Sequence, residues 1–338
     1  MSARACIIPV FVPHLGCPHA CVFCNQNRIS GQWKRVTASD VINAIETAAA
    51  FLPKGEKRQL AFYGGSFTAI PQTRQEELLT AAEPYLRKGE LSSVRVSTRP
   101  DAIDGETLAR LRRFGVETIE LGAQSMDEEV LRLSGRGHTA RDVERSAGMI
   151  RENGFSLILQ MMTGLPGDTP EKDIQTAHRL IALHPDGVRI YPTVVVRDTA
   201  LYDWWRAGTY REHTVEDAVE ICAEILPLFD RAGIPVLRVG LNPTEALTSG
   251  EAVAGAYHPA LGELARSRIL RRRAEALLEG IAPGSRVILS AGRGKTSQMI
   301  GQHRQNLEYL CRRFSLRSIQ VTERPEAGEE ILLVSVEK

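Results

Sequence analysis

The strongest signal in this 338-residue chain is Cys17-Pro18-His19-Ala20-Cys21-Val22-Phe23-Cys24, which spaces three cysteines as C-x3-C-x2-C. The stretch follows an apolar segment, Ala5–Val12, that has the composition of a β-strand. In a reducing compartment, cysteines crowded in this way indicate metal binding or catalysis before disulfides. Three soft thiolates on one short loop suit three corners of a four-iron four-sulfur cluster, and the fourth iron then has no obvious protein ligand.

Two other interpretations of these cysteines remain. A structural zinc site needs four ligands, and although His14 or His19 could be the fourth, neither has a familiar zinc-finger spacing. The three thiols could also be unrelated and buried. The remaining cysteines, Cys6, Cys222 and Cys311, lie in apolar segments, and we expect them to be core thiols instead of ligands of a second cluster.

The composition is that of a globular protein, with 43% hydrophobic and 25% charged residues. A net charge of +1 gives no whole-chain argument for a nucleic-acid or membrane partner. No apolar run reaches the roughly 18 to 20 residues that cross a bilayer, and the start does not resemble a signal peptide, so we expect a cytoplasmic protein without a membrane partner. The segment Ala246–Lys338 has 14 basic and 10 acidic residues, which makes it the place to look for a polyanionic partner.

Apolar, β-branched runs alternate with segments of helical period, as in repeated βα units with a parallel sheet. A capping box with Asp40 predicts a helix over Thr37–Phe51, and Gly115, Gly154 and Gly233 each end a helical pattern before a strand. This alternation of strands and helices predicts an α/β barrel or open sheet, in which chemistry takes place at the carboxyl ends of the strands. The expected strands are Ala5–Val12, Gln59–Tyr63, Val94–Thr98, Thr118–Leu121, Ser156–Met162, Val188–Pro192 and Val236–Val239.

The regular alternation of strand and helix patterns ends after about residue 241. We therefore predict two domains, a core over residues 1–245 and a smaller α+β domain over residues 246–338. The second domain begins with a basic helix candidate, Leu261–Glu279, that contains five arginines. Two short helices are expected around Gly301. The expected strands of this domain are Arg286–Ser290, Ser318–Thr322 and Ile331–Val336.

The cysteine loop, with the aromatic Phe23 just before its last cysteine, resembles the cluster loop of radical S-adenosylmethionine (SAM) enzymes. The resemblance implies a partial (β/α)6 barrel and two cofactors, SAM and a four-iron four-sulfur cluster held by Cys17, Cys21 and Cys24. It also implies that the open iron binds the amino and carboxylate groups of SAM. An electron from a donor such as flavodoxin or ferredoxin then cleaves SAM, and the resulting 5′-deoxyadenosyl radical abstracts hydrogen from a substrate.

The ends of the second, third and fourth predicted strands carry residues suited to a polar ligand. Gly64 and Gly65 let a ligand approach the backbone, although paired glycines also form tight turns. An arginine or carboxylate that points into a barrel, such as Arg99 or Glu120, needs a charged partner or a polar ligand. These two side chains could therefore also pair with each other across the barrel mouth.

The family resemblance extends to these strand ends and to the fifth strand. The segment at Gly64 and Gly65 is similar to the family's GGE motif, which contacts the methionyl amino group, with Ser66 in place of the glutamate. The segment at Gly164 is similar to the one that supports the adenine, and Asp168 or Thr169 after it is expected to cap a helix. The resemblance thus implies a SAM pocket formed by Gly64, Gly65, Ser66, Arg99, Glu120, Gln124 and Gly164.

Further stretches are similar to the radical SAM domain of the Elongator catalytic subunits, which modify the wobble uridine of transfer RNA. They include Arg136–Thr139 and Arg189–Thr199 and extend to Tyr210. The resemblance implies that Arg189 and Tyr191 are the catalytic residues that contact the substrate, in place of a lysine–tyrosine pair. The chain ends where an acetyltransferase domain would follow, and its cysteine spacing is shorter, so we do not expect acetyl-CoA-dependent chemistry.

The last segment resembles a minimal KH-type RNA-binding unit, strand–helix–loop–helix–strand, in which a GxxG loop clamps the RNA backbone. Here the loop is Gly301-Gln302-His303-Arg304, with arginine in place of the second glycine. The resemblance implies RNA contacts by Arg293, Lys295, His303 and Arg304. The alternative is an α+β cap whose basic residues face solvent.

We therefore predict a radical SAM enzyme that modifies a nucleotide of transfer or ribosomal RNA. Two alternatives stay open. The chain could be a radical SAM enzyme for a small metabolite or peptide, or an iron–sulfur protein without enzymatic activity that binds RNA or transfers electrons. The last alternative predicts no SAM binding and no 5′-deoxyadenosine after reduction, whereas both enzymes require them.

Overall fold

The computed structural model describes residues 6–12, 21–25, 28–29, 34–51, 57–242 and 247–337. The chain forms two compact units, Met1–Thr214 with Leu228–Tyr257 and Val215–Pro227 with His258–Lys338. The division runs through helix α10 (Val215–Arg231), whose first part belongs to the second unit. The division into functional domains after residue 245 stays a prediction. In the described part of the chain, every helix falls short of the length and apolarity that a membrane span requires.

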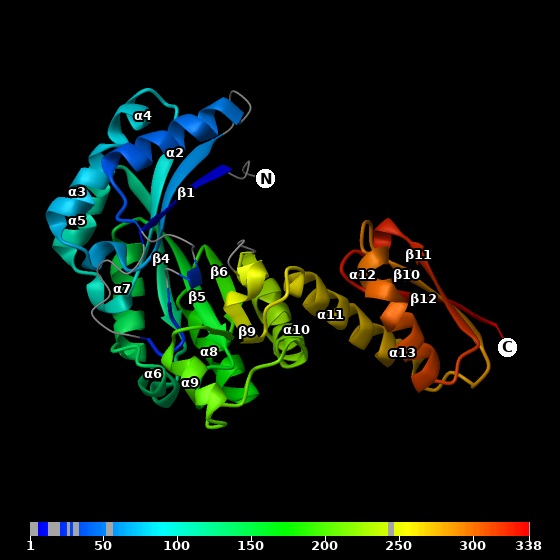
Figure 1. Cartoon of the computed structure of the whole chain (residues 1–338). Coiled ribbons are helices and arrows are strands. Elements are labelled where there is room, and N and C mark those ends of the chain that lie inside the picture. Colours follow the sequence, from blue (N-terminus) through cyan, green and yellow to red (C-terminus); the bar gives the residue numbers. More distant parts are fainter. Residues whose placement is uncertain are drawn as a thin grey trace. The chain divides into compact units, whose positions relative to one another are not determined.

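The first unit is built around a curved sheet of seven strands in the order β1-β2-β3-β4-β5-β6-β8, with helices along its outer side (Figure 1). Every neighbouring pair is parallel. All seven predicted strands are present, and the predicted fold class, a partial barrel of βα units, is confirmed. The strands are β1 (Cys6–Val12), β2 (Arg58–Gly64), β3 (Ser93–Thr98), β4 (Val116–Gln124), β5 (Ser156–Thr163), β6 (Gly187–Pro192) and β8 (Val236–Val239).

Local sequence signals set the helix ends. The predicted capping box is present, because the amide of Thr37 donates to Asp40 Oδ2 at 2.7 Å and the amide of Asp40 to Thr37 Oγ1 at 3.3 Å. Gly115, Gly154 and Gly233 have positive φ between a helix and a strand, as predicted. The other helices of this unit are α2 (Ala38–Phe51), α3 (Gln72–Thr80), α4 (Glu83–Arg87), α5 (Gly105–Arg113), α6 (Glu128–Leu133), α7 (Ala140–Glu152), α8 (Pro170–Ala182) and α9 (Ala200–Arg206).

The two faces of the curved sheet differ in polarity, because successive side chains on a strand point to opposite faces. On β2, Leu60 and Phe62 are fully buried, whereas Tyr63 lines a cavity on the inner face. On β3, Val96 is fully buried, whereas Arg95 lines the same cavity. The apolar core therefore lies between sheet and helices, and the interior of the half-barrel is polar.

A short antiparallel pair of strands, β7 (Val194–Val196) and β9 (Ala252–Gly255), also belongs to the first unit, and the sequence did not predict it. Gly255 has φ +91°, and a Cβ there would lie 2.8 Å from the Thr193 carbonyl oxygen. This glycine therefore allows the two strands to approach each other closely where they meet.

The second unit contains a three-stranded sheet in the order β11-β10-β12, in which β10 (Arg286–Ala291) pairs parallel with β11 (Ser318–Glu323) and antiparallel with β12 (Ile331–Glu337). Its helices are α11 (Leu261–Leu278), α12 (Thr296–Ile300) and α13 (Gln305–Arg313). The predicted strands and helices of this segment are thus present. The buried core of this unit is formed by its helices and by all three strands, and it includes Leu270, Ala274, Leu278, Val287, Leu289, Met299, Leu310, Ile319 and Ile331.

The predicted excess of positive charge in the C-terminal segment is largely neutralised within the second unit. On α11, Arg268 pairs with Glu216 at 2.8 Å, Arg272 pairs with Glu224, and Arg271 pairs with Glu275 of its own helix at 3.3 Å. The first part of α10 contributes four acidic and no basic residues to this unit. The arginines of this basic helix are therefore paired with carboxylates of the same unit, and binding of a polyanion by the C-terminal segment stays a prediction.

Candidate functional site

The cysteine loop is described in part. Cys17, together with His14 and His19, lies outside the described residues. Cys21 and Cys24 are both half-buried thiols in one turn, closed by a hydrogen bond of 3.0 Å from the Cys24 amide to the Cys21 carbonyl. Two of the three predicted ligand thiols are therefore partly accessible and share one turn, and their role as cluster ligands stays a prediction.

Backbone and apolar contacts hold this turn in place. The amide of Val22 donates to the carbonyl of Ser134, after α6, at 3.1 Å, and the amide of Leu201 on α9 donates to the Val22 carbonyl at 2.8 Å. Phe23 packs against the apolar cluster that contains Leu201 and Tyr210. The aromatic residue before the last cysteine therefore anchors the loop to the α9 region.

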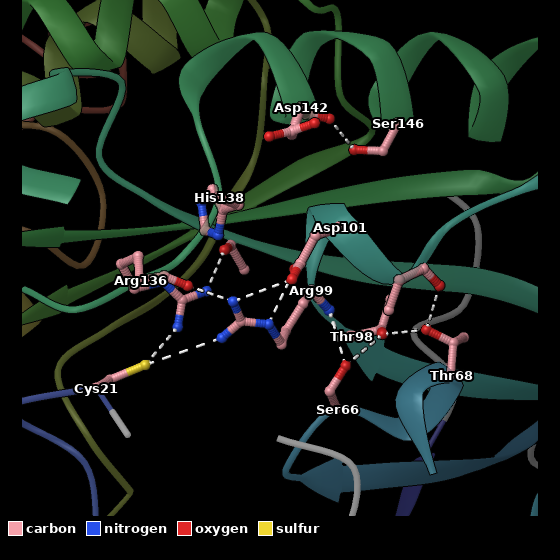
Figure 2. A network of polar contacts seen from close by, with 12 residues as sticks. Cys21, Ser66, Thr68, Thr98, Arg99, Asp101, Arg136, His138, Asp142 and Ser146 are labelled. Carbon is pink, nitrogen blue, oxygen red and sulfur yellow. Dashed lines mark hydrogen bonds and ion pairs between the residues drawn. The ribbon is translucent and has the colours of Figure 1, made fainter. Parts of the chain in front are cut away.

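Two guanidinium groups lie beside the Cys21 thiol (Figure 2). Arg136 Nη1 is 3.2 Å and Arg99 Nη1 4.0 Å from Cys21 Sγ. Arg136 Nη2 also donates to the Gly122 carbonyl at 2.8 Å, and Arg99 pairs with Asp101 at 2.9 Å. Arg99 already makes two hydrogen bonds to Asp101, whereas the buried Nε of Arg136 has no hydrogen-bond partner among the described residues. The region next to Cys21 therefore suits an anionic ligand that Arg136 can bind.

His138 adds no charge to this region at neutral pH. Burial, and then the positive charge of Arg136, lower the pKa of His138 to about 4. Its Nε2 lies 3.2 Å from the Ala123 carbonyl, which suits a neutral ring that donates from Nε2. The positive charge here therefore comes from the arginines.

Gln124, at the end of β4, has two features of a ligand-binding residue. Its φ is +65°, a left-handed conformation that is costly for a residue other than glycine, and the β4–β5 register shifts at this point. Its Oε1 atom is buried and has no hydrogen-bond partner among the described residues. A strained backbone and an orphaned amide oxygen fit a ligand that completes the hydrogen bond.

The predicted residues at the end of β2 are occupied by contacts within the protein. Ser66 Oγ lies 2.9 Å from Thr98 Oγ1 and accepts a hydrogen bond of 3.3 Å from the Arg99 amide (Figure 2). Gly64 has φ +110°, and a Cβ there would lie 2.9 Å from the Val12 carbonyl oxygen. The glycine thus allows the ends of β1 and β2 to approach each other closely.

Gly164, at the end of β5, is held from three sides. Its carbonyl accepts a hydrogen bond of 2.7 Å from the Tyr210 hydroxyl, and its amide donates to the carboxyl of Asp173. Burial, and then the charge of Asp168, raise the pKa of Asp173 well above its usual range. His213 packs directly on the glycine, since a Cβ there would lie 2.1 Å from His213 Cγ.

The residues after Gly164 match the prediction of a helix cap. The hydroxyl of Thr169 accepts a hydrogen bond of 3.3 Å from the amide of Lys172 at the start of α8. Asp168 accepts the Thr169 amide at 3.0 Å instead of capping the helix itself. Of the two candidates, Thr169 is therefore the cap.

Replacing Gly164 by alanine is expected to lower the free energy of unfolding by about 2–4 kcal/mol, because backbone strain at φ +71° adds to the clash with His213. Gly208→Ala is the matched control, since Gly208 has φ +73° but nothing within 4 Å of the added methyl group. Urea unfolding of both variants measures the difference. Equal losses in the two variants would show that the packing of His213 contributes nothing.

Glu120 lies at the centre of a second polar network, inside the half-barrel. Its fully buried carboxylate pairs with Arg95 Nη1 at 2.6 Å and with Arg189 Nε at 2.9 Å. It also accepts hydrogen bonds from the Tyr63 hydroxyl at 3.2 Å and from Gln160 Nε2 at 3.0 Å. The alternative in which Glu120 pairs with the arginine at position 99 is therefore wrong, because each has another partner.

The network fixes the ionisation of its members. Burial disfavours the charged form of Glu120, but the charge of Arg189 and the hydrogen bond from Arg95 outweigh this effect and lower the pKa of Glu120. Burial, and then the charge of Glu120, raise the pKa of Tyr63. Burial also raises the pKa of Tyr191. At neutral pH the carboxylate is thus ionised and both phenols are protonated.

A cavity of about 840 Å³ fills the inner side of the sheet, and all seven strands contribute to its lining. Gln160, Arg189 and Tyr191 line it, so the prediction that Gln160 faces the interior is confirmed. The cavity is of the size that small-molecule sites have in proteins.

The predicted site residues thus lie in three places: beside the cysteine turn, in the cavity of the half-barrel and, for the predicted RNA-binding residues, in the second unit. Cys21 and Arg99 lie together at the carboxyl ends of the strands, and Arg189 and Tyr191 line the cavity near Glu120. Sequence reasoning missed Arg95 and Tyr63, although the alternation of side chains along each strand was a usable signal for their inward positions. It assigned no role to Arg136, which lay within a stretch singled out only by resemblance.

The predicted RNA-binding residues lie in the second unit. His303 and Arg304 are exposed and have positive φ, +50° and +64°, in the loop between α12 and α13. Arg293 is exposed as well, whereas Lys295 forms an ion pair with Glu329. Three of the four side chains are thus accessible to a ligand.

The cysteines expected in the core differ in burial. Cys222 is buried, and Cys311 packs against the core of the second unit. Cys6 is half-buried at the start of β1.

Two family models match this chain. A model described as the Radical SAM superfamily matches residues 11–180, and one described as the Radical_SAM C-terminal domain matches residues 185–271. The first match includes the cysteine loop and the first five strands apart from the start of β1.

Among curated proteins, the human Elongator complex protein 3 is 30% identical over 236 residues, which are 63% of this chain and 42% of that protein. The tRNA uridine(34) acetyltransferase of Dehalococcoides mccartyi is 35% identical over 136 residues, 39% of this chain and 30% of that protein. The chain therefore spans less than half the length of these relatives. Among solved structures, the archaeal Methanocaldococcus infernus Elp3 with an N-terminal deletion has a TM-score of 0.63 at 20% identity, covering 80% of this chain and 64% of that one.

Proposed function

Because this chain belongs to the radical SAM superfamily, we propose that it is an enzyme that cleaves SAM in order to modify a nucleotide of RNA. Members of the family use SAM and a four-iron four-sulfur cluster, the cofactors that the cysteine spacing suggests. When bound and reduced, these cofactors supply an organic radical that removes a hydrogen atom from the substrate. Such chemistry needs an electron donor, for which a flavodoxin or ferredoxin is our proposal.

Cys17, Cys21 and Cys24 are the proposed ligands of the cluster. The two described thiols fit this role, since they are half-buried, share one turn and are held in place from α6 and α9. The surroundings fit a carboxylate of SAM as well, because Arg99 and Arg136 lie beside Cys21. These arginines next to the cluster loop are the observation that carries the proposal.

The proposed SAM pocket extends from this point along the strand ends. The orphaned Oε1 of Gln124 supports its role as a SAM ligand. Tyr210 and His213 fix the backbone at Gly164, which suits its proposed contact with SAM. Both carboxylate oxygens of Glu120 already accept hydrogen bonds within the protein. We therefore propose that Glu120 positions arginine side chains and does not contact SAM directly. The remaining proposed members are Gly64, Gly65, Ser66 and Arg99.

Anaerobic reconstitution and reduction test the enzymatic proposal. We expect release of 5′-deoxyadenosine and methionine from SAM, and the modified nucleosides of a deletion strain should differ from those of its parent. An unchanged RNA profile with intact SAM cleavage would favour a small metabolite or peptide as substrate. Absence of SAM cleavage in cluster-loaded protein would contradict the enzymatic proposal and favour an electron-transfer or RNA-binding protein.

RNA as the substrate is supported by the relatives, one of which is a tRNA uridine(34) acetyltransferase. The exposed loop with His303 and Arg304 in a left-handed conformation also supports it, since strained residues cluster at ligand-binding loops. Because the charges of the second unit are nearly balanced, we expect only a few phosphate contacts to contribute to the affinity for RNA. A cytoplasmic location belongs to the same proposal, because crowded thiols suit a reducing compartment.

Salt-dependent binding of transfer RNA tests the RNA contacts. The double substitution Arg293→Glu and Arg304→Glu is expected to weaken binding and to reduce the slope of log affinity against log salt by about one for each phosphate that the protein no longer binds. Arg206→Glu on α9 is the control for a general effect of charge. Filter binding at several salt concentrations measures both, and an unchanged slope in the double variant would contradict the proposed RNA-binding role of these arginines.

A further inference from the structure

The cavity inside the half-barrel carries a surplus of positive charge. Four cationic side chains line it, Lys57, Arg95, Arg189 and Arg238. Among the described lining residues the one carboxylate is the exposed Glu117, and the buried Glu120 beside the cavity pairs with Arg95 and Arg189. Low-dielectric walls strengthen the field of such a surplus, so the cavity attracts anions.

Two of these cations, Arg95 and Arg189, are held in fixed positions. Arg95 donates from Nη1 to Glu120 at 2.6 Å and from Nε to Gln59 Oε1 at 2.7 Å. Arg189 contacts both oxygens of Glu120, from Nε at 2.9 Å and from Nη2 at 3.1 Å. Two guanidinium groups around one carboxylate leave the trio with a net positive charge. Because these side chains are already ordered, little entropy is lost when they bind a ligand.

Strand register places further suitable groups beside this pair. Arg189 lies between Gln160 of β5 and Arg238 of β8 in neighbouring positions of the sheet. The rings of Phe11 and Tyr63, 6.2 Å apart, line the same cavity and offer apolar surface to the uncharged part of a ligand. A volume of about 840 Å³ leaves room for considerably more than a single anionic group.

We propose that the interior of the half-barrel is an oxyanion site, in which Arg95 and Arg189 bind a phosphate ester or carboxylate of the substrate. Glu120 acts as a positioning residue that holds both guanidinium groups in place. This inference rests on the proposed radical SAM function and deepens it, because it defines the substrate as an anion. The oxyanion comes either from a nucleotide or from a small carboxylic acid.

Calorimetry on cluster-loaded protein without reductant tests the site with three probes, uridine 5′-monophosphate, uridine as its uncharged counterpart, and succinate. We expect one anionic probe to bind at least about tenfold more tightly than uridine, and added salt to reduce the difference. Arg189→Gln is expected to abolish the preference, and Arg189→Lys to retain part of it. Preference for the nucleotide identifies a phosphate ester as the source, and preference for succinate identifies a carboxylic acid.

Two controls keep the result unambiguous. Arg206→Gln, on α9 and outside the cavity lining, should leave all affinities unchanged. Thermal unfolding shows whether each variant is folded, and Arg95→Gln replaces Arg189→Gln if the latter unfolds. The oxyanion site is overturned if neither anionic probe binds more tightly than uridine, or if the arginine variants keep the preference. SAM cleavage by the same preparation after reduction tests the proposed function separately, so either idea can fail alone.

Discussion

Replacing Cys21 or Cys24 by alanine is expected to remove most of the bound iron and to reduce SAM cleavage by more than about a hundredfold. The physical reason is that outer-shell substitutions at metal sites already cost up to about a hundredfold, and loss of a direct ligand costs more. With two thiolates left, a second iron of the cluster loses its protein ligand. Iron content and the absorbance of the cluster measure the first effect, and release of 5′-deoxyadenosine measures the second.

Cys311→Ala is the matched control for this experiment. Cys311 is also a partly buried thiol, but it packs against the apolar core of the second unit, where no ligand role is proposed. Iron content and SAM cleavage should both stay at the level of the unmodified protein. If Cys21→Ala and Cys24→Ala retain full iron as well, the thiols are not cluster ligands and the enzymatic proposal loses its basis.

The strands could be predicted because their signals are local. Each is a short apolar run, and Gly115, Gly154 and Gly233 separate helices from strands through a positive φ that local sequence dictates. The capping box at Thr37 depends on Asp40 three residues away. The cysteine spacing is local in the same sense, so it indicates cluster chemistry without reference to the fold.

The charge pairing could not be predicted, because it depends on contacts that are remote in sequence. Glu120 bonds to Arg95, 25 residues away, and to Arg189, 69 residues away, whereas the sequence suggested Arg99, at the next strand end, only as one alternative partner. The ion pairs of the basic C-terminal segment could not be predicted for the same reason. Its acidic partners, such as Glu216, come from a helix that the sequence assigned to the other domain.

Replacing Glu120 by glutamine is expected to lower the free energy of unfolding by about 3–5 kcal/mol, because removal of one partner leaves buried charges uncompensated. The affected charges are those of Arg95 and Arg189, which are mostly buried. Urea unfolding at pH 7 measures the loss. Glu117→Gln on the same strand is the matched control, since Glu117 is exposed and its loss should cost under about 0.5 kcal/mol.

The pH dependence of the unfolding free energy shows whether Glu120→Gln destabilises the protein by removing a charge or by disturbing the packing. The pKa of Glu120 is lower in the folded protein than in the unfolded chain, so its contribution to stability is present above the unfolded pKa and is lost as the pH falls through the folded one. The gap in unfolding free energy between the unmodified protein and Glu120→Gln should therefore narrow as the pH is lowered. A gap that stays constant with pH would mean that glutamine disturbs packing alone, and that the carboxylate does not hold the two arginines by its charge.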